Sequence, residues 1–172
     1  DVCPYYLSKP WKFNKTFKND FIQAISGLII KAFEENEGSI LAFLPGAREI
    51  KQVQTFLKAK LANDLDIYPL YGAMSFDEQQ KAILPSCRRK LILATSIAET
   101  SLTIKDIRIV IDSGLTRRSR FDPSSGMSRL ITERVTKAEA IQRMGRAGRT
   151  NTGVCYKLWT KGEEGGLKPF PE

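Results

Sequence analysis

The feature that most constrains the fold is the alternation of short apolar runs with longer amphipathic segments. The apolar runs are flanked by turn residues, which is the pattern of strands buried on both faces. Strands that alternate with helices form a parallel sheet covered on both sides. The chain is therefore expected to be one α/β domain, with a mainly parallel sheet and helices on both faces. The expected strands cover residues 40–44, 67–70, 90–94, 107–111 and 154–159, and the expected helices residues 20–36, 47–61 and 75–84.

A β-hairpin is expected where this alternation is interrupted after residue 112. Two β-rich arms, residues 115–121 and 128–136, flank the turn-forming sequence DPSSG. Thr136 and Glu139 then have the spacing of a capping box, which opens a further helix. The ends of the chain are less regular. Residues 1–18 are expected to be a linker or edge segment, and the Gly/Glu/Pro-rich residues from 161 onward to be disordered.

The octamer QRMGRAGR at residues 142–149 concentrates arginine and glycine in one place. On a helix, Gln142, Arg146 and Arg149 lie at i, i+4 and i+7 and share one face. Arginine presents a planar fork of donors that matches phosphate oxygens, and glycine lets the backbone approach a ligand closely. The alternative is a solvated basic helix end. The interleaved Gln142, Gly145 and Gly148 favour a phosphate-binding segment.

The net charge of +8 is unevenly distributed. Residues 115–150 hold nine basic and three acidic residues, a net charge of +6 within about one fifth of the chain. Such clustering favours a polyanionic partner. For the hairpin arginines, the alternative is a well-solvated arm whose charges prevent edge-to-edge aggregation.

Two further segments follow expected strands, where parallel α/β sheets bind ligands. TSIAETSLT at residues 95–103 carries hydroxyls that can donate to phosphate oxygens. LPGAREI at residues 44–50 opens a helix, whose free N–H groups can hold a phosphate. The structural alternatives are a capped helix start for the first segment and a simple turn for the second.

Several function classes are disfavoured by what the sequence lacks. There is no G-x-x-x-x-G-K-[ST] phosphate loop and no Asp-Glu pair after a buried strand, so the chain lacks the parts that hold ATP and Mg²⁺. It has no histidine, and its three cysteines have no metal-ligand spacing, so no metal site is expected. No apolar run is long enough to span a membrane, and a cytoplasmic location is expected.

Taken in order, residues 44–50, 95–103 and 142–149 resemble motifs IV, V and VI of superfamily 2 helicases. The chain is similar to the C-terminal RecA-like domain of DEAH-box/RHA helicases, and its hairpin segment is closest to that of bacterial HrpB-like ATP-dependent helicases. The resemblance implies a RecA-like (P-loop NTPase-like) domain over residues 19–160, with a hairpin protruding between motifs V and VI. Residues 1–18 would then be a linker from a preceding RecA-like domain, and residues 161–172 would lead to a following domain.

The same resemblance implies roles for particular residues. Arg146 and Arg149 would be arginine fingers, and Gln142 would order the attacking water or the γ-phosphate. ATP and Mg²⁺ would be held mainly by the preceding domain, and single-stranded RNA or DNA would be the partner. The residues implied to bind the nucleotide are Gly145, Thr103, Asp106 and Ile83. Those implied to bind nucleic acid are Gly46, Arg48, Thr95, Ser96, Glu99, Thr100, Arg117, Arg118 and Arg120.

The sequence departs from the family pattern at three positions. Ser96 stands where the family usually has Asn, and Lys105 where many members have an acidic residue for the ribose, with Asp106 one position later. Eukaryotic relatives have an aromatic residue near Ile83 to stack on the adenine, whereas Ile83 offers only apolar contact. The hypothesis that follows is weak selectivity among nucleoside triphosphates.

The predicted function is the C-terminal motor domain of an ATP-dependent RNA or DNA helicase. The 172 residues alone are expected to be inactive, because the phosphate loop and the Mg²⁺-binding box are missing. The alternatives are a non-catalytic nucleic-acid-binding module with the same fold and an arginine-rich scaffold domain with a protein partner. The sequence does not distinguish RNA from DNA, nor does it indicate unwinding polarity or oligomeric state.

Overall fold

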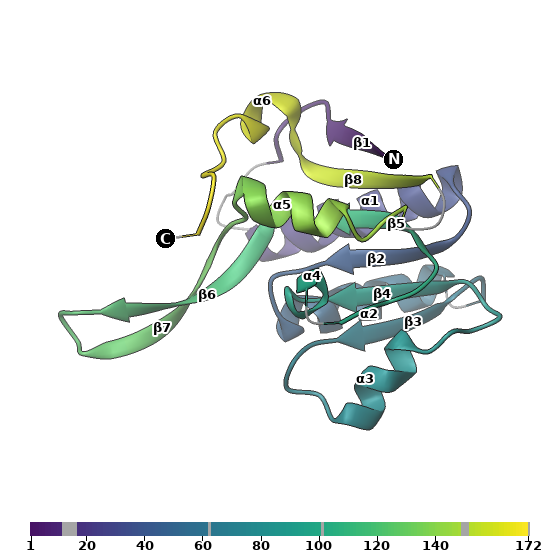
Figure 1. Ribbon diagram of the computed structural model, residues 1–172, viewed down its shortest axis with the longest axis horizontal. Coiled ribbons are helices and arrows are strands. Elements are labelled where there is room, and N and C mark those ends of the chain that lie inside the picture. The colour runs from purple at the N-terminus through teal and green to yellow at the C-terminus, as the bar shows by residue number, and fades with distance from the viewer. Residues whose placement is uncertain (12–16, 62, 101, 149–151, 172) are drawn as a thin grey trace.

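Six parallel strands form the central sheet, in the order β1-β8-β5-β2-β4-β3 (Figure 1). The structure is a computed structural model that describes residues 1–11, 17–61, 63–100, 102–148 and 152–171. The strands are β1 (Val2–Leu7), β2 (Ser39–Phe43), β3 (Asp66–Leu70), β4 (Lys90–Ala94), β5 (Ile107–Asp112) and β8 (Gly153–Thr160). Every neighbouring pair is parallel, which confirms the expected sheet.

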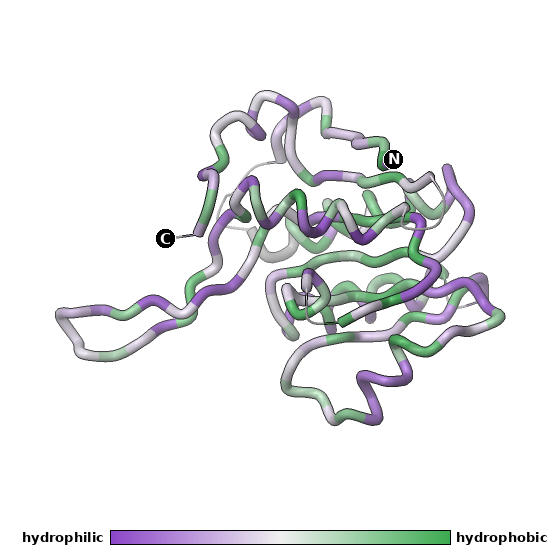
Figure 2. The backbone as a smooth tube through the Cα atoms, viewed as in Figure 1, coloured by the Kyte–Doolittle hydropathy of each residue, from purple (hydrophilic) through white to green (hydrophobic). Residues whose placement is uncertain are grey.

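Helices cover both faces of this sheet, as expected. The helices α1 (Phe17–Glu35) and α2 (Ala47–Leu61) lie on one face, and α3 (Phe76–Ile83), α4 (Ile97–Thr100) and α5 (Lys137–Met144) on the other (Figure 1). Within β2, Ile40 and Ala42 pack with α1 and α2, whereas Leu41 and Phe43 pack with α3 and α4. This alternation explains why the strands are apolar throughout, and they stand out as the hydrophobic centre of Figure 2.

The helix α2 shows how local pattern sets an element. Its buried residues are Ile50, Val53, Leu57 and Leu61, a single stripe at helical spacing, and most of its other residues are polar. The expected bounds of this helix, residues 47–61, match the observed ones. The short helix α4 lies within residues 95–103, for which a helix start was the structural alternative, although four residues are too few to show a helical period.

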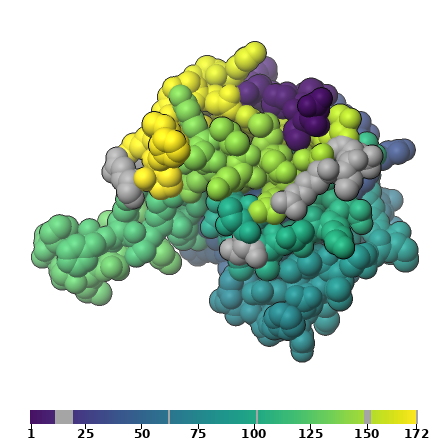
Figure 3. Space-filling model, viewed as in Figure 1, coloured from purple at the N-terminus to yellow at the C-terminus, as the bar shows by residue number. Residues whose placement is uncertain are grey.

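The hairpin projects from the body of the domain as a narrow arm (Figures 1 and 3). Strands β6 (Leu115–Asp122) and β7 (Met127–Arg134) pair antiparallel, from Leu115 opposite Arg134 to Asp122 opposite Met127. At the tip, the Asp122 carboxylate accepts hydrogen bonds from Ser124 and Ser125. The expected hairpin is confirmed. Its second strand ends at Arg134 rather than residue 136, because Thr136 is the N-cap of α5.

The N-terminal segment contains an edge strand. Among the residues that the structure describes, Val2–Leu7 pairs only with β8, so these residues form an edge strand, as the expectation of an edge segment had it. Pro4 is tolerated because an edge strand has one side without ladder hydrogen bonds. Residues 12–16 lie outside the described ranges.

The expectation of disorder after residue 160 was wrong. Lys161–Glu164 forms the helix α6, opened by a capping box between Thr160 and Glu163. The Glu164 carboxylate accepts hydrogen bonds from Tyr6, Lys157 and Trp159, which fixes α6 against β8 and the end of β1. Beyond α6, Leu167 is buried.

The residues after Leu167 contact the start of α5. The backbone N–H groups of Lys137 and Ala138 donate to the carbonyl oxygens of Lys168 (2.7 Å) and Pro169 (3.1 Å). The first N–H groups of a helix have no partner within the helix, so the tail satisfies two of them. The tail therefore takes part in positioning α5.

Candidate functional site

The segment that resembles motif VI begins in α5 and continues beyond it. Gln142 is exposed on the helix, Gly145 is its C-cap and is also exposed, and Arg146 lies in the following turn. Gln142 and Arg146 therefore do not share a helix face, and that expectation was wrong. The two glycines explain the break, because Gly145 ends the helix and Gly148 has a positive φ of 71°. Arg149 lies outside the described residues.

Arg146 reaches the segment that resembles motif V. Its Nε donates to the carbonyl oxygen of Glu99 at 2.7 Å and its Nη1 to that of Leu102 at 3.2 Å, while Nη2 also donates to Glu99. Backbone carbonyls near the end of α4 thus hold the guanidinium. This contact places a predicted arginine finger directly beside motif V.

Arg143 is a residue at the centre of the candidate site that the sequence analysis missed. Its side chain is fully buried, with Nε 2.6 Å from Glu99 Oε2 and Nη1 2.8 Å from Asp112 Oδ1. Nη1 also donates to the carbonyl oxygen of Leu115, and the guanidinium lies 4.9 Å from the centre of the Phe43 ring. One arginine thus joins α5, α4 and the carboxyl end of β5. Its position three residues after Ala140, on the buried face of α5, was the available signal.

The positive charge of Arg143 is stabilised by the negative charges of Asp112 and Glu99. Burial alone would lower the pKa of Arg143, but the carboxylates of Asp112 and Glu99 outweigh that effect and raise it. Burial raises the pKa of the Glu99 carboxyl, and the pairing with Arg143 opposes this shift only in part. Arg143 therefore stays charged, and it is the main partner of both carboxylates.

Motif V presents its hydroxyl residues at the carboxyl end of β4. Thr95 is half-buried, and Ser96 and Thr100 are exposed, so these three predicted nucleic-acid contacts are accessible. Glu99 differs, because its carboxylate is buried against Arg143. A contact between that carboxylate and a nucleic acid would require Arg143 to be released first.

In motif IV, Arg48 is exposed but Gly46 is covered. A Cβ atom at Gly46 would lie 2.0 Å from Nη1 of Arg117, so the glycine makes room for that guanidinium. Nη2 of Arg117 in turn pairs with Glu49 of α2 at 3.2 Å. The hairpin residue Arg117 therefore occupies the helix start that was expected to face nucleic acid.

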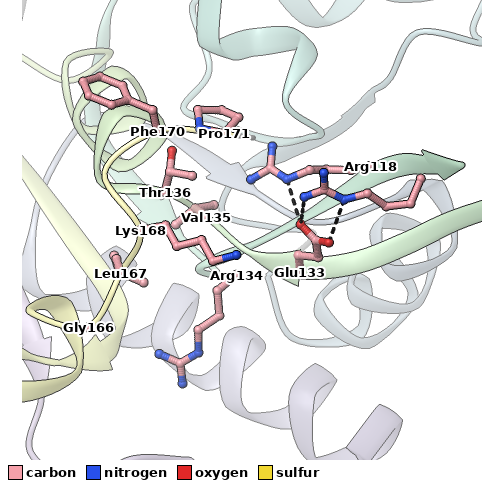
Figure 4. A pocket seen from close by; sticks show the side chains of 11 residues that line it. Arg118, Glu133, Arg134, Val135, Thr136, Gly166, Leu167, Lys168, Phe170 and Pro171 are labelled. Carbon is pink, nitrogen blue, oxygen red and sulfur yellow. Dashed lines mark hydrogen bonds and ion pairs between the residues drawn. The ribbon is translucent and has the colours of Figure 1, made fainter.

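The other predicted hairpin contacts are also engaged within the domain. Arg118 and Arg120 both pair with Glu133 (Figure 4), and Arg118 also pairs with Glu139. These arginines line one side of a small cavity of about 100 Å³ at the base of the hairpin, closed on the other side by tail residues such as Leu167 and Phe170. In this structure, the guanidinium groups of Arg118 and Arg120 form ion pairs with carboxylates.

These ion pairs reduce the positive charge available to a polyanion. Arg117, Arg134 and Arg143 pair with acidic residues that lie outside residues 115–150, namely Glu49, Glu163, Glu99 and Asp112. The local net charge of +6 read from the sequence is therefore larger than the charge this region presents after folding.

Of the residues predicted to contact a nucleotide, Ile83, Thr103 and Gly145 lie on the face that carries α3, α4 and α5, whereas Asp106 directly precedes β5, at the end of the sheet opposite motif V. Ile83 and Leu102 pack against the same apolar cluster, and Thr103, next to Leu102, is exposed. Asp106 is exposed and has a positive φ of 66°. Arg146 contacts the Leu102 carbonyl, so Thr103 and the motif VI turn are neighbours. The structure therefore brings Thr103, a predicted nucleotide contact, close to Arg146, a predicted arginine finger.

Neither a metal-ligand cluster nor a membrane-spanning helix occurs in the described ranges. In those ranges, no three His, Cys, Asp or Glu side chains are grouped so that they could hold a metal ion. Within the same ranges, every helix is too short or too polar to span a bilayer.

Comparison with known proteins gives consistent matches. Residues 20–151 match the family described as helicase conserved C-terminal domain. The ATP-dependent RNA helicase HrpB of Escherichia coli K12 is 47% identical over 143 residues, which are 82% of this chain and 18% of that protein. The probable ATP-dependent RNA helicase DHX34 of Mus musculus is 37% identical over 164 residues, 93% of this chain and 14% of that protein.

Solved structures agree with the sequence matches. A crystal structure of the E. coli DExH-box NTPase HrpB superimposes with a TM-score of 0.86 and 42% identity, covering 99% of this chain and 21% of that one. A second HrpB crystal structure, titled as a DEAH/RHA helicase, gives a TM-score of 0.87 with the same identity and coverage. The chain thus spans less than a quarter of the length of these relatives.

Proposed function

Because this chain belongs to the family of helicase conserved C-terminal domains, we propose that it is one half of an ATP-driven motor that moves on single-stranded RNA. The helicase family, predicted from motifs IV, V and VI, and the likeness to HrpB-like DEAH helicases, predicted from the hairpin segment, are confirmed. So is the RecA-like fold. The activity, the substrate and the partner domain are the proposal.

The observation that carries the proposal is the contact between Arg146 and motif V. A guanidinium beside exposed hydroxyls, at the glycine-rich end of α5, suits a phosphate of a nucleotide held from outside the domain. The chain contains no phosphate loop, so its residues fit a phosphate only as the second half of a site. A preceding RecA-like domain of the same protein would supply the first half and the Mg²⁺ ligands.

Each residue then has a defined part. ATP supplies the phosphoanhydride bond whose hydrolysis drives motors of this kind. Arg146 leaves the carbonyl oxygens of Glu99 and Leu102 and turns toward the phosphates as the two domains close. Arg149 and Gln142 join it from the same segment. Thr95, Ser96 and Thr100 contact the backbone of the strand, so opening and closing of the cleft moves the strand.

RNA is proposed as the substrate because the matched relatives are named RNA helicases. Contacts to the phosphate backbone of the strand would make binding largely independent of sequence, and cationic contacts among them would make it dependent on salt. A cytoplasmic location, expected from the cysteine pattern, belongs to the same proposal.

Nucleoside triphosphate selectivity follows from Ile83. This side chain is half-buried in the apolar cluster beside Leu102 and can give a base only apolar contact. We expect similar rates with ATP, GTP, CTP and UTP. A strict preference for ATP in the full-length protein would contradict this part of the proposal.

The decisive experiment is RNA-stimulated ATP hydrolysis by the full-length protein, with wild type compared to Arg146→Ala and Arg149→Ala. Loss of a finger is expected to lower turnover by about 10³- to 10⁵-fold. Arg88→Ala is the matched control, since Arg88 forms an exposed ion pair with Asp66 and a long, exposed hydrogen bond to the Asn63 carbonyl, and neither belongs to motifs IV, V or VI. Binding of RNA without hydrolysis in the wild type would instead favour a non-catalytic binding module. Parallel assays with single-stranded DNA separate the two substrates.

A further inference from the structure

Two adjacent residues attach the hairpin to the rest of the domain from opposite faces. Side chains alternate along a strand, so Arg117 and Arg118 of β6 point to opposite sides of the hairpin. Arg117 pairs with Glu49 of α2, in motif IV, and Arg118 pairs with Glu139 in the first turn of α5, the helix in which motif VI begins. The base of the hairpin is therefore attached to α2 and to α5 at once.

The contact with α5 is the stronger of the two. Nη2 and Nη1 of Arg118 donate to the two carboxylate oxygens of Glu139 at 2.6 and 2.8 Å, a bidentate pair, while Nε donates to Glu133 at 3.0 Å. The side chains of Arg118 and Glu139 are only 16% and 12% exposed. Paired charges that are bidentate and shielded from water hold their geometry better than exposed single contacts.

Glu139 also determines where α5 begins. Its Oε1 accepts the backbone N–H of Thr136 at 2.8 Å, and its own N–H donates to Thr136 Oγ1 at 3.2 Å, which completes the capping box. Arg118 therefore binds the residue that fixes the first turn of α5. The same helix carries Gln142 and Arg143 and leads directly into Arg146.

The outer part of the hairpin depends on this base for its orientation. A two-stranded hairpin is marginally stable by itself, and β6 and β7 form a sheet separate from the central one. Beyond the base, Phe121, Met127 and Leu130 are all exposed. A force on the outer arm thus reaches the body through the attachments at its base.

We propose that Arg118 is a positioning residue that couples the hairpin to the motif VI helix, so that a strand pressing on the hairpin changes the placement of Arg146. This inference rests on the proposed function. It assigns Arg118 a role inside the domain, in place of the nucleic-acid contact expected from sequence. Its carboxylate partner, Glu139, has the matching role on α5.

The test uses RNA-stimulated ATP hydrolysis by the full-length protein and separates two quantities: turnover at saturating single-stranded RNA and the RNA concentration for half-maximal stimulation. Arg118→Ala is expected to lower saturating turnover about tenfold, with little change in the half-stimulating concentration. A nucleic-acid contact predicts the reverse. The half-stimulating concentration would then rise, the salt dependence would weaken by about one unit of slope, and saturating RNA would restore turnover.

Glu139→Gln tests the pair from its other side. Glutamine at this position can still complete a capping box, so α5 keeps its start while the charge that holds Arg118 is lost. Turnover is expected to fall in this variant as well, and the double variant should be no slower than the slower single variant. Independent, multiplying losses would overturn the proposal. If Arg118→Ala fails to fold, as judged by circular dichroism, Glu139→Gln still decides the question.

Arg129→Ala is the matched control. Arg129 lies on the same face of the hairpin, directly opposite Arg120, and is exposed. The variant removes the same charge from the same arm and should keep wild-type turnover at saturating RNA. Wild-type turnover at saturating RNA in both Arg118→Ala and Glu139→Gln would contradict the coupling but leave the proposed function standing. Absence of stimulation in the wild type would contradict the proposed function itself.

Discussion

Arg143 and Glu99 form a buried ion pair, 2.6 Å between Nε and Oε2, that joins motif VI to motif V inside the domain. The carbonyl oxygen of the same Glu99 accepts hydrogen bonds from Arg146. Glu99 thus contacts both arginines, one through its side chain and one through its backbone. Motifs V and VI are therefore one physical unit, and a shift of α4 must displace both arginines.

Removing the Arg143 side chain should lower the free energy of unfolding more than a substitution at an exposed position nearby. Arg143→Met leaves Glu99 and Asp112 buried without their main partner, which is expected to cost about 3–5 kcal/mol. The measurement is the free energy of unfolding of the 172-residue chain in urea. The control is Gln142→Ala, an exposed neighbour expected to change stability by less than about 0.5 kcal/mol. Equal stabilities for the two variants would rule out a buried structural arginine.

The sheet and the hairpin could be predicted because their signals are local. A buried strand is a short apolar run, an amphipathic helix repeats over a few turns, and the capping box of Thr136 and Glu139 spans four residues. Those elements were found within a few residues of their observed bounds. The strand Val2–Leu7 was harder to identify, because its pairing partner β8 lies about 150 positions away and Pro4 weakens its pattern.

The tail shows what local composition misses. Its glycines and charges suggested disorder, yet Tyr6 and Trp159 both bind Glu164, and Leu167 is buried. The signal that was overlooked is the Thr160 and Glu163 capping box, which is as clear in the sequence as the one that opens α5.

The segments of the candidate site were identified from sequence, but the carboxylates that bind its arginines were not. The carboxylates that bind Arg117 and Arg143 lie 68 positions away in the first case and 44 and 31 in the second. No spacing rule connects such residues. Helical spacing from Ala140 could have indicated the buried face for Arg143, but only the fold shows which carboxylates bind it and that Arg117 covers Gly46.

The tail should contribute measurably to stability. Leu167 packs with Val135, Ala140 and Trp159, so Leu167→Ala is expected to cost about 2–5 kcal/mol in the free energy of unfolding. Phe170→Ala, three residues later and 71% exposed, should change it by less than about 0.5 kcal/mol. Thermal or urea unfolding of both variants makes the comparison. If Leu167→Ala left the free energy of unfolding unchanged, the result would support the disordered tail that composition predicted.

The capping carboxylate Glu139 should make stability depend on pH in the acid range. Burial would raise its pKa, but hydrogen bonds from Arg118 and Thr136 outweigh burial and lower the pKa to about 2, against about 4.3 in an unfolded chain. A lowered pKa means that the stabilisation is complete above the unfolded value and is lost as pH falls toward 2. Glu139→Gln should therefore be less stable than wild type by about 1.5–3 kcal/mol at pH 7.

Urea unfolding at a series of pH values from 7 down to 2 checks this expectation. The wild-type free energy of unfolding should decline more steeply than that of Glu139→Gln, and the two curves should converge at the acid end. Carboxylates that do not contact Arg118, such as Glu163, which pairs with Arg134, are present in both proteins and cancel in the difference. Parallel curves over the whole range would show that Glu139 is not a buried, paired carboxylate.

The turn that carries Arg146 should be sensitive to a single methyl group on the neighbouring strand. A Cβ atom at Gly153 would lie 2.6 Å from the backbone nitrogen of Gly148 and 2.8 Å from Cβ of Ala147. Backbone cannot move aside as a flexible side chain can, so Gly153→Ala is expected to cost about 1–3 kcal/mol of stability. It should also displace the turn and lower RNA-stimulated turnover of the full-length protein.

Gly162→Ala is the control, since the nearest neighbour of its added Cβ atom would be 3.9 Å away and alanine favours the α6 helix. If Gly153→Ala retained both wild-type stability and wild-type turnover, the close packing of β8 against the motif VI turn would be refuted.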